Sequence, residues 1–152
     1  MTEASEPPAP SLEDRLHALQ ERLDVRFQDV GLLREAMTHE SYSHEHGMES
    51  SNERLEFLGD AVLGLAVGHY LFVTWPDQRE GQLTRLKSMV VSAGFLARRA
   101  RELDLGAYLI LGKGEAASGG RQRGSVLADA LEALIGAIFI DQGLAAASRF
   151  VL

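Results

Sequence analysis

Apolar residues recur every three or four positions along most of the chain, which is the spacing of one face of an α-helix. Ser11, Ser92 and Ser125 precede such stretches and favour helix N-termini, whereas Pro76 and Gly143 follow them and favour helix ends. No alternation typical of half-buried strands is present. The pattern therefore predicts an all-α fold, with helices at about 12–23, shortly after 29, at about 51–75, twice within 81–103, at about 125–142, and from 144 onward.

Polar or unusual segments separate the predicted helices. Residues 39–50 are rich in His, Ser and Glu and residues 112–124 are rich in Gly, so both are expected to be loops. Residues 1–10 are small, acidic and Pro-rich, and we expect a disordered tail there before one domain at 11–152. Residues 144–152 include nothing that would end a helix, so we expect the natural protein to continue.

The composition restricts the chemistry and the location. The chain has no Cys, which excludes disulfides and thiolate metal sites and suits a reducing cytoplasm, where we expect the protein. The apolar stretches 61–67 and 131–140 are shorter than the roughly 20 residues that cross a bilayer, so no membrane association is expected. The net charge of −7 opposes nucleic-acid binding, which would need divalent cations or a basic segment outside this chain.

Three carboxylates share one face of the predicted helix at 51–75. At 100° per residue, Glu53, Glu56 and Asp60 lie within about 60° of one another, with Leu58 on the opposite face. Beyond Asp60 the sequence is apolar all round through Val67. This composition predicts a helix that is buried on every side.

Two further carboxylates, Asp129 and Glu132, lie three residues apart on an otherwise apolar helix. Asp60, Asp129 and Glu132 have no Lys or Arg three or four residues away in the sequence. A glycine follows an acid by four residues in each helix, at Gly64 and Gly136, and would allow the helices to approach closely on the acidic side. We therefore expect four carboxylates to meet.

Such an all-oxygen cluster suits Mg²⁺ or Mn²⁺. A metal ion held there can lower the pKa of a bound water and stabilise a departing oxygen, which favours phosphodiester hydrolysis. The alternative is that these acids are solvated helix faces. The apolar surroundings and the missing basic partners count against that alternative.

The segment Asn52–Leu63, NERLEFLGDAVL, resembles the signature motif of the ribonuclease III family. Residues 38–42, THESY, resemble its THxSY element, and residues 80–83 its EGxL element. Residues 111–120 and 127–136 resemble its LGxGE…GG…LADxxEALIGA segment. The resemblance covers nearly all of the chain after the first predicted helix.

This resemblance implies a homodimeric, multi-helix endonuclease domain that cleaves double-stranded RNA in rRNA and mRNA processing. The products would carry 5′-phosphate and 3′-hydroxyl ends with a short 3′ overhang. The resemblance implies that Glu56, Asp60, Asp129 and Glu132 bind Mg²⁺, which Mn²⁺ can replace, and that Asp60 and Glu132 are catalytic. Most bacterial members also carry a C-terminal double-stranded-RNA-binding domain, which this chain does not include.

The resemblance also implies roles for residues outside the four acids. Glu53 and Glu80 match accessory acidic positions near the substrate or the dimer contact. Phe57 matches an aromatic that plugs a socket in the partner subunit, although its position in the pattern also suits an ordinary core phenylalanine.

Basic side chains are candidates for RNA contacts. For Lys113, Arg121 and Arg123 in the Gly-rich segment we favour contact with RNA phosphates. For the arginines at 98, 99 and 101, phosphate contact and simple solvation are equally supported.

Three rival interpretations make different demands on the chain. A catalytically silent dimerisation or scaffold module would typically lack some of the acids. A di-iron helical bundle needs Glu-x-x-His pairs, and no histidine here follows a Glu by three. A zinc site at His39, His44 and His46 is disfavoured by irregular spacing and the absence of Cys, and a loop with His39 in a structural hydrogen bond is the preferred interpretation.

Overall fold

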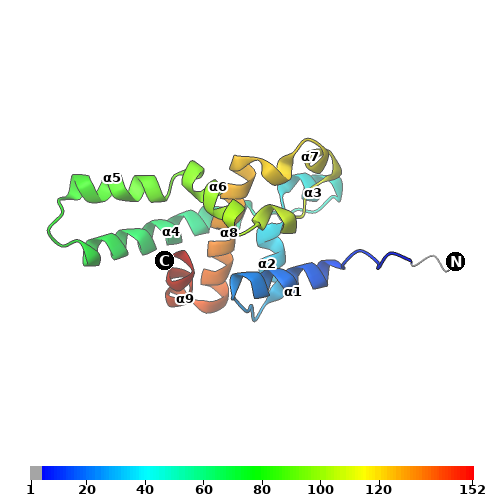
Figure 1. The fold of residues 1–152 in the computed structure, drawn as a ribbon, viewed down its shortest axis with the longest axis horizontal. Coiled ribbons are helices and arrows are strands. Elements are labelled where there is room, and N and C mark those ends of the chain that lie inside the picture. Colours follow the sequence, from blue (N-terminus) through cyan, green and yellow to red (C-terminus); the bar gives the residue numbers. More distant parts are fainter. Residues whose placement is uncertain (1–4) are drawn as a thin grey trace.

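A computed structural model of the chain describes residues 5–152, and their regular structure is helical (Figure 1). Within this range the only pairing of β type is an isolated bridge between Thr38 and Ile110, so the predicted all-α fold is confirmed. The elements are α1 (Leu12–Leu23), α2 (Val30–Met37), α3 (Glu40–Glu45), α4 (Glu53–Thr74), α5 (Glu80–Val90), α6 (Ala93–Glu102), the 3₁₀ turn η1 (Leu105–Tyr108), α7 (Lys113–Ala117), the 3₁₀ turn η2 (Gly120–Gln122), α8 (Gly124–Gln142) and α9 (Leu144–Val151).

Helix α8 forms the centre of the molecule, with α2, α4, α6 and α9 packed around it (Figure 1). Its side chains are apolar on almost every side, and Leu127, Leu134 and Ile138 are at most 1% exposed. Burial of each such side chain stabilises the fold by about 1.5–3 kcal/mol. This helix is therefore largely buried, as its otherwise apolar sequence indicates.

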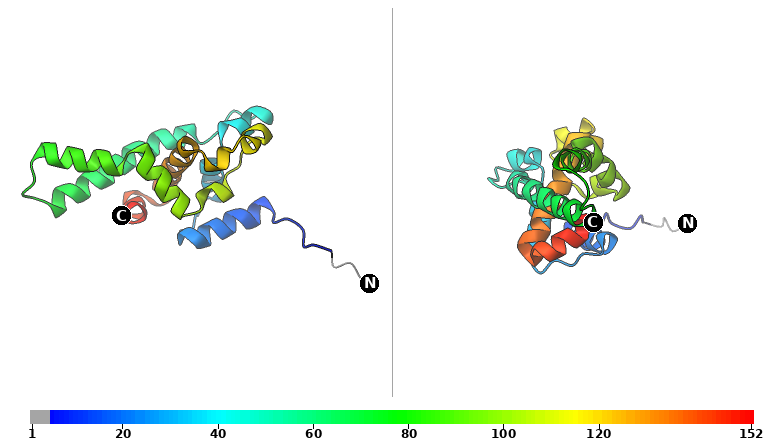
Figure 2. Two further views of the ribbon diagram at one scale, coloured as in Figure 1. Left: turned by 45° about the horizontal axis from the view of Figure 1, so that its top comes forward. Right: turned by 90° about the vertical axis from the view of Figure 1, so that its left-hand side faces the viewer.

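Helix α4 packs on α8 with its first half, and its second half runs out antiparallel to α5 as a hairpin that projects from the body (Figure 2). Leu65 and Phe72 on α4 are 56% and 69% exposed. The prediction that this helix is buried on every side is therefore wrong for a single chain. Among residues 5–152 no further helix covers the outer face of the protruding hairpin, and none of the residues in α5 is fully buried.

By length and composition, α4 is apolar enough to cross a bilayer, with a mean hydropathy of 1.5 over its most apolar window. This corrects the expectation that no apolar stretch is long enough. The core helix of a protein outside the membrane can pass the same test. The first half of α4 carries the acids and packs on α8, and 33% of the apolar window is buried within the single chain.

Helix boundaries follow local capping where the cap is near in sequence. The Ser11 and Ser92 hydroxyls accept backbone N–H groups of α1 and α6, as expected, and the Asp29 carboxylate does the same for α2. Ser125 is not a cap, because α8 already begins at Gly124. Residues 5–10 of the predicted tail have no regular structure, and residues 1–4 lie outside the described range.

The two segments expected to be loops each contain a short helix. His39 caps α3 through Nδ1, which accepts the Ser41 N–H at 3.1 Å. The carboxylate of Glu45, at the end of α3, accepts the backbone N–H groups of Lys113 and Gly114 at the start of α7. These short helices depend on side-chain caps, one of which comes from a distant part of the chain, so hydrophobic periodicity does not reveal them.

Candidate active site

The backbones of α4 and α8 touch beside the acidic residues. A Cβ atom on Gly59 of α4 would lie 1.7 Å from the carbonyl oxygen of Glu132, and one on Gly136 of α8 would lie 2.4 Å from the carbonyl oxygen of Leu55. No side chain fits at either position, since real Cβ atoms stay beyond 3.0 Å of such neighbours. These two glycines therefore set the spacing of the helices.

Of the two glycines predicted to allow this approach, Gly136 does so and Gly64 does not. Gly64 faces α5 instead, where its Cβ would lie 3.6 Å from the side chain of Lys87. The glycine of α4 that meets α8 is Gly59, three residues after Glu56. Its place on the acidic side of an otherwise apolar helix was a usable signal that sequence reasoning missed.

The helix contact places four carboxylates side by side in two pairs that span the junction. Glu56 of α4 lies against Asp129 of α8, and Asp60 of α4 lies against Glu132 of α8. Asp60 is exposed and the other three are partly buried. Within residues 5–152, none of the four forms an ion pair with a basic side chain. The fold thus assembles the four acids without neutralising them.

Burial and mutual repulsion raise the pKa of Glu56, Asp129 and Glu132. Burial, followed by the hydrogen bond and charge of Asp60, raises the pKa of Glu132 to about 8. Burial, followed by the charge of Asp129, raises the pKa of Glu56 to about 7. Burial also raises the pKa of Asp129, against the opposing effect of its hydrogen bond with Glu56. Each pair is therefore stabilised by a shared proton.

This donor set fits a hard divalent cation. All four side chains offer carboxylate oxygens, which are the ligands that Mg²⁺ and Mn²⁺ prefer. In the described part of the chain, no three acidic or histidine side chains surround one point as metal ligands do. A divalent cation would replace these protons and offset the repulsion between the acids.

Asn52 anchors the start of α4 and so positions the first acids. It is 4% exposed, its backbone N–H donates to the Thr38 carbonyl at 2.8 Å, and its side-chain amide donates to the Ala36 carbonyl at 3.2 Å. Its own carbonyl accepts the N–H of Glu56 at 2.8 Å. Sequence reasoning did not assign this role, although a polar amide directly before the acidic face was a signal.

His39 has the predicted structural role, because its ring nitrogen caps α3. Burial lowers the pKa of His39, while the negative charges of Glu40 and Asp129 oppose that shift. His46, at the other end of α3, stacks on Tyr42 with ring centroids 4.0 Å apart. The histidine-rich segment is thus a capped and stacked short helix beside the acids.

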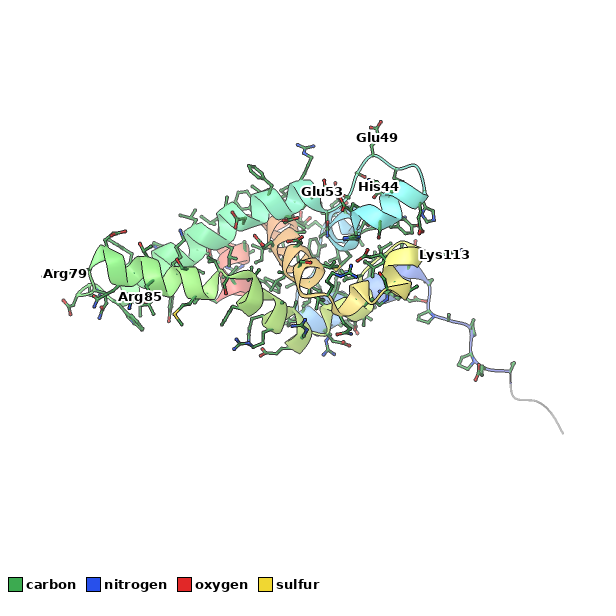
Figure 3. All side chains as sticks on the ribbon, turned by 90° about the horizontal axis from the view of Figure 1, so that it is seen from above. His44, Glu49, Glu53, Arg79, Arg85 and Lys113 are labelled. Carbon is green, nitrogen blue, oxygen red and sulfur yellow. The ribbon has the colours of Figure 1, made fainter. Side chains whose placement is uncertain are left out.

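Glu53 lies at the first turn of α4, beside α3 rather than among the four acids. Its carboxyl group hydrogen-bonds with Glu40, and this contact raises the pKa of Glu53. Figure 3 shows Glu53 at the junction of the two helices, close to His44. The charge of Glu53 still contributes to the raised pKa of Glu56, so the accessory position predicted for it is compatible with this geometry.

Glu80 and Phe57 do not reach the four acids within one chain. Glu80 begins α5, accepts a hydrogen bond from the Thr84 hydroxyl at 2.8 Å, and follows Arg79 at the outer end of the hairpin (Figure 3). Phe57 is 82% exposed, so the alternative of an ordinary core phenylalanine is wrong for the single chain.

The three basic candidates of the Gly-rich segment have different surroundings. Nη1 of Arg121 donates to the carbonyls of Gly106 and Leu109 at 3.1 and 2.6 Å, which gives Arg121 a structural role, and its RNA contact stays a prediction. Arg123 pairs with Glu115. Lys113 is exposed at the first turn of α7, where its ammonium can reach a ligand.

Comparison with known proteins identifies the family. A model of the family described as ribonuclease-III-like matches residues 29–152. The chain belongs to the ribonuclease III family. It is 58% identical over 135 residues to ribonuclease 3 of Oleidesulfovibrio alaskensis, covering 88% of this chain and 59% of that protein. It is 53% identical over 146 residues to ribonuclease 3 of Pelotomaculum thermopropionicum, covering 94% and 60%. The chain thus spans about three-fifths of the length of these relatives.

Solved structures show the same ribonuclease III nuclease fold. The nuclease domain of ribonuclease III from Campylobacter jejuni is 40% identical, with a TM-score of 0.84 over 89% of this chain and 92% of that one. That domain is described as flexible in a region involved in dimer formation. Dicer from Pichia stipitis is 28% identical with a TM-score of 0.52, over 91% of this chain and 51% of that one. The predicted family and fold are confirmed.

Proposed function

We propose that this chain is a divalent-metal-dependent endoribonuclease that hydrolyses double-stranded RNA, including structured rRNA and mRNA precursors. The observation that carries the proposal is the convergence of two carboxylates from α4 and two from α8 without a basic partner in the described chain. Relatives that carry the name ribonuclease 3 support it.

In this proposal, Glu56, Asp60, Asp129 and Glu132 hold Mg²⁺, which Mn²⁺ can replace. The metal ion, when bound, supplies a Lewis acid that acidifies water and stabilises charge on the departing oxygen. Asp60 is the exposed member of the four and is best placed to accept a proton from the attacking water. Glu132 lies against Asp60 and holds it in position.

The bond changes determine the product ends. The water oxygen forms a bond to phosphorus, the bond from phosphorus to the 3′ oxygen breaks, and that oxygen takes up a proton. Hydrolysis in this direction leaves a 5′-phosphate and a 3′-hydroxyl, as the family resemblance implies.

The proposed active unit is a homodimer built on the outer face of α4. Phe57 on this helix exposes 82% of its surface, and it lines one groove together with Ile140 of α8, which is 53% exposed. Apolar side chains gathered in this way favour a protein partner. A two-fold dimer suits an antiparallel duplex, because each subunit would cut one strand and leave a short 3′ overhang. Phe57 would insert into the second copy, and Glu80 would lie near the dimer contact or the substrate.

The test is cleavage of a long RNA duplex in low salt with Mg²⁺, comparing wild type with Glu132→Gln. We expect duplex cutting that a chelator and the substitution both abolish, because the chelator removes the metal ion and the substitution removes one of the carboxylates proposed to hold it. Sequencing of the cut ends checks the predicted overhang. A folded, dimeric wild type that leaves the duplex intact would support the catalytically silent module instead.

A further inference from the structure

A groove between α4 and α5 opens directly beside the proposed catalytic carboxylate. Its volume is about 750 Å³, and Asp60, Gly64, His69 and Lys87 are among the residues that line it. Asp60 contributes to both the acid cluster and this groove. The groove is thus a continuation of the proposed active site along the α4–α5 hairpin.

Lys87 reaches across this groove from α5 to the backbone of α4. A Cβ atom on Gly64 would lie 3.6 Å from both Cε and Nζ of Lys87, so the ammonium group rests over the space that the glycine leaves open. Gly64 is four residues after Asp60, which is about 6 Å along a helix axis. A positive charge therefore lies about one helical turn from the exposed acid.

The ammonium of Lys87 is available to a ligand. Within residues 5–152 it forms no ion pair, including none with the nearby Asp60, whose carboxylate lies against Glu132 instead. Lys87 is exposed at the groove. A chain with a net charge of −7 needs local positive charge where a polyanion must approach its carboxylates.

We propose that Lys87 binds a backbone phosphate of the RNA next to the phosphate that is cleaved. This inference rests on the proposed function and adds a substrate contact to it. A lysine ammonium binds phosphate as a point charge with three rotatable donors, so it can hold the strand without reading its sequence. The contact would fix the strand in register with Asp60.

The first experiment compares Lys87→Gln, Lys87→Arg and the control Arg85→Gln in duplex binding and cleavage. Arg85 is an exposed residue on the same helix that does not line the groove, and Figure 3 shows it toward the outer part of α5, away from Glu53. We expect Lys87→Gln to lower kcat/KM about tenfold or more. Lys87→Arg should recover most of that loss, and Arg85→Gln should stay within about twofold of wild type.

A second experiment separates phosphate contact from a structural effect. Duplexes carry a single neutral methylphosphonate, moved one position at a time around the cut site. We expect a methylphosphonate at one neighbouring position to lower cleavage by the wild type about as much as Lys87→Gln does. The same methylphosphonate should lower cleavage by the Lys87→Gln variant no further.

The outcomes also separate this inference from the proposed function. If the wild type cleaves the duplex and Lys87→Gln is equally active, the Lys87 contact alone is overturned. The same holds if Lys87→Gln responds to every methylphosphonate as the wild type does. A wild type that neither binds nor cuts the duplex overturns both.

Discussion

The contact between Gly59 and α8 yields the sharpest prediction, because the fold leaves no room for a methyl group there. A Cβ at Gly59 would lie 1.7 Å from the Glu132 carbonyl oxygen, and the smallest tolerated separation is 3.0 Å, so Gly59→Ala must part the helices by at least 1.3 Å at this point (3.0 minus 1.7). Both neighbouring groups are backbone, which cannot rotate away. The carboxylates on the two helices must separate with them.

Two effects on stability oppose each other in Gly59→Ala. Alanine gains about 1 kcal/mol of helix propensity over glycine, whereas forced overpacking costs about 1–3 kcal/mol or more. The 1.7 Å approach is severe, so we expect a net loss of about 2 kcal/mol in the free energy of unfolding. A displacement of about 1 Å at a reacting centre costs about 10²-fold in rate, and we expect a loss of that order in kcat.

The assays are denaturant unfolding followed by circular dichroism, and Mg²⁺-dependent duplex cleavage under conditions where the variant is folded. Gly94→Ala is the matched control: Gly94 also lies in a helix, is exposed, and its Cβ would meet nothing within 4 Å. The control should retain wild-type activity and gain up to about 1 kcal/mol in the free energy of unfolding from helix propensity. If Gly59→Ala matched the control in both assays, the helix contact would not be what sets the spacing of the acids.

Three other perturbations test the remaining contacts. In chelator, the melting temperature should fall as pH rises from about 4.5 towards 8. The pKa values of Glu56 (about 7) and Glu132 (about 8) are raised in the folded state, which therefore binds more protons than the unfolded state over this range. Glu132→Gln should flatten this pH dependence, and a wild-type melting temperature that does not change with pH would contradict the prediction. Arg121→Ala should destabilise the fold by about 2 kcal/mol in denaturant unfolding, since two backbone carbonyls lose their donor. Lys113→Ala should leave the free energy of unfolding unchanged and weaken RNA binding. The reverse pattern would exchange the two roles. Phe57→Asp should shift sedimentation from dimer to monomer, and an unchanged dimer would place the interface elsewhere.

Much of the candidate site could be predicted from the sequence because its parts are local. Glu56 and Asp60 share a helix face through the α-helical period alone, and so do Asp129 and Glu132. The apolar surroundings of each pair indicated that the two helices pack together. Four residues from two distant segments could therefore be grouped from spacing and composition alone.

The parts that could not be predicted depend on contacts between distant segments. The carboxylate of Glu45 caps α7 from 68 residues away, which no local pattern encodes. Arg121 is a basic residue in a Gly-rich segment, which favoured an RNA contact, yet its guanidinium lies against the carbonyls of Gly106 and Leu109. Its role follows from the path of the chain around it rather than from its own sequence environment.

The sequence by itself determined the helical class, most helix positions, the two acidic faces and the family resemblance, because each follows from spacing within one segment or from a contiguous motif. Only the tertiary structure decided that Gly59 rather than Gly64 meets α8, that the outer face of α4 is exposed, and that Lys87 lies over Gly64 beside Asp60. The physical reason is that periodicity fixes which residues share a face, whereas the packing of one helix on another fixes which face meets which neighbour.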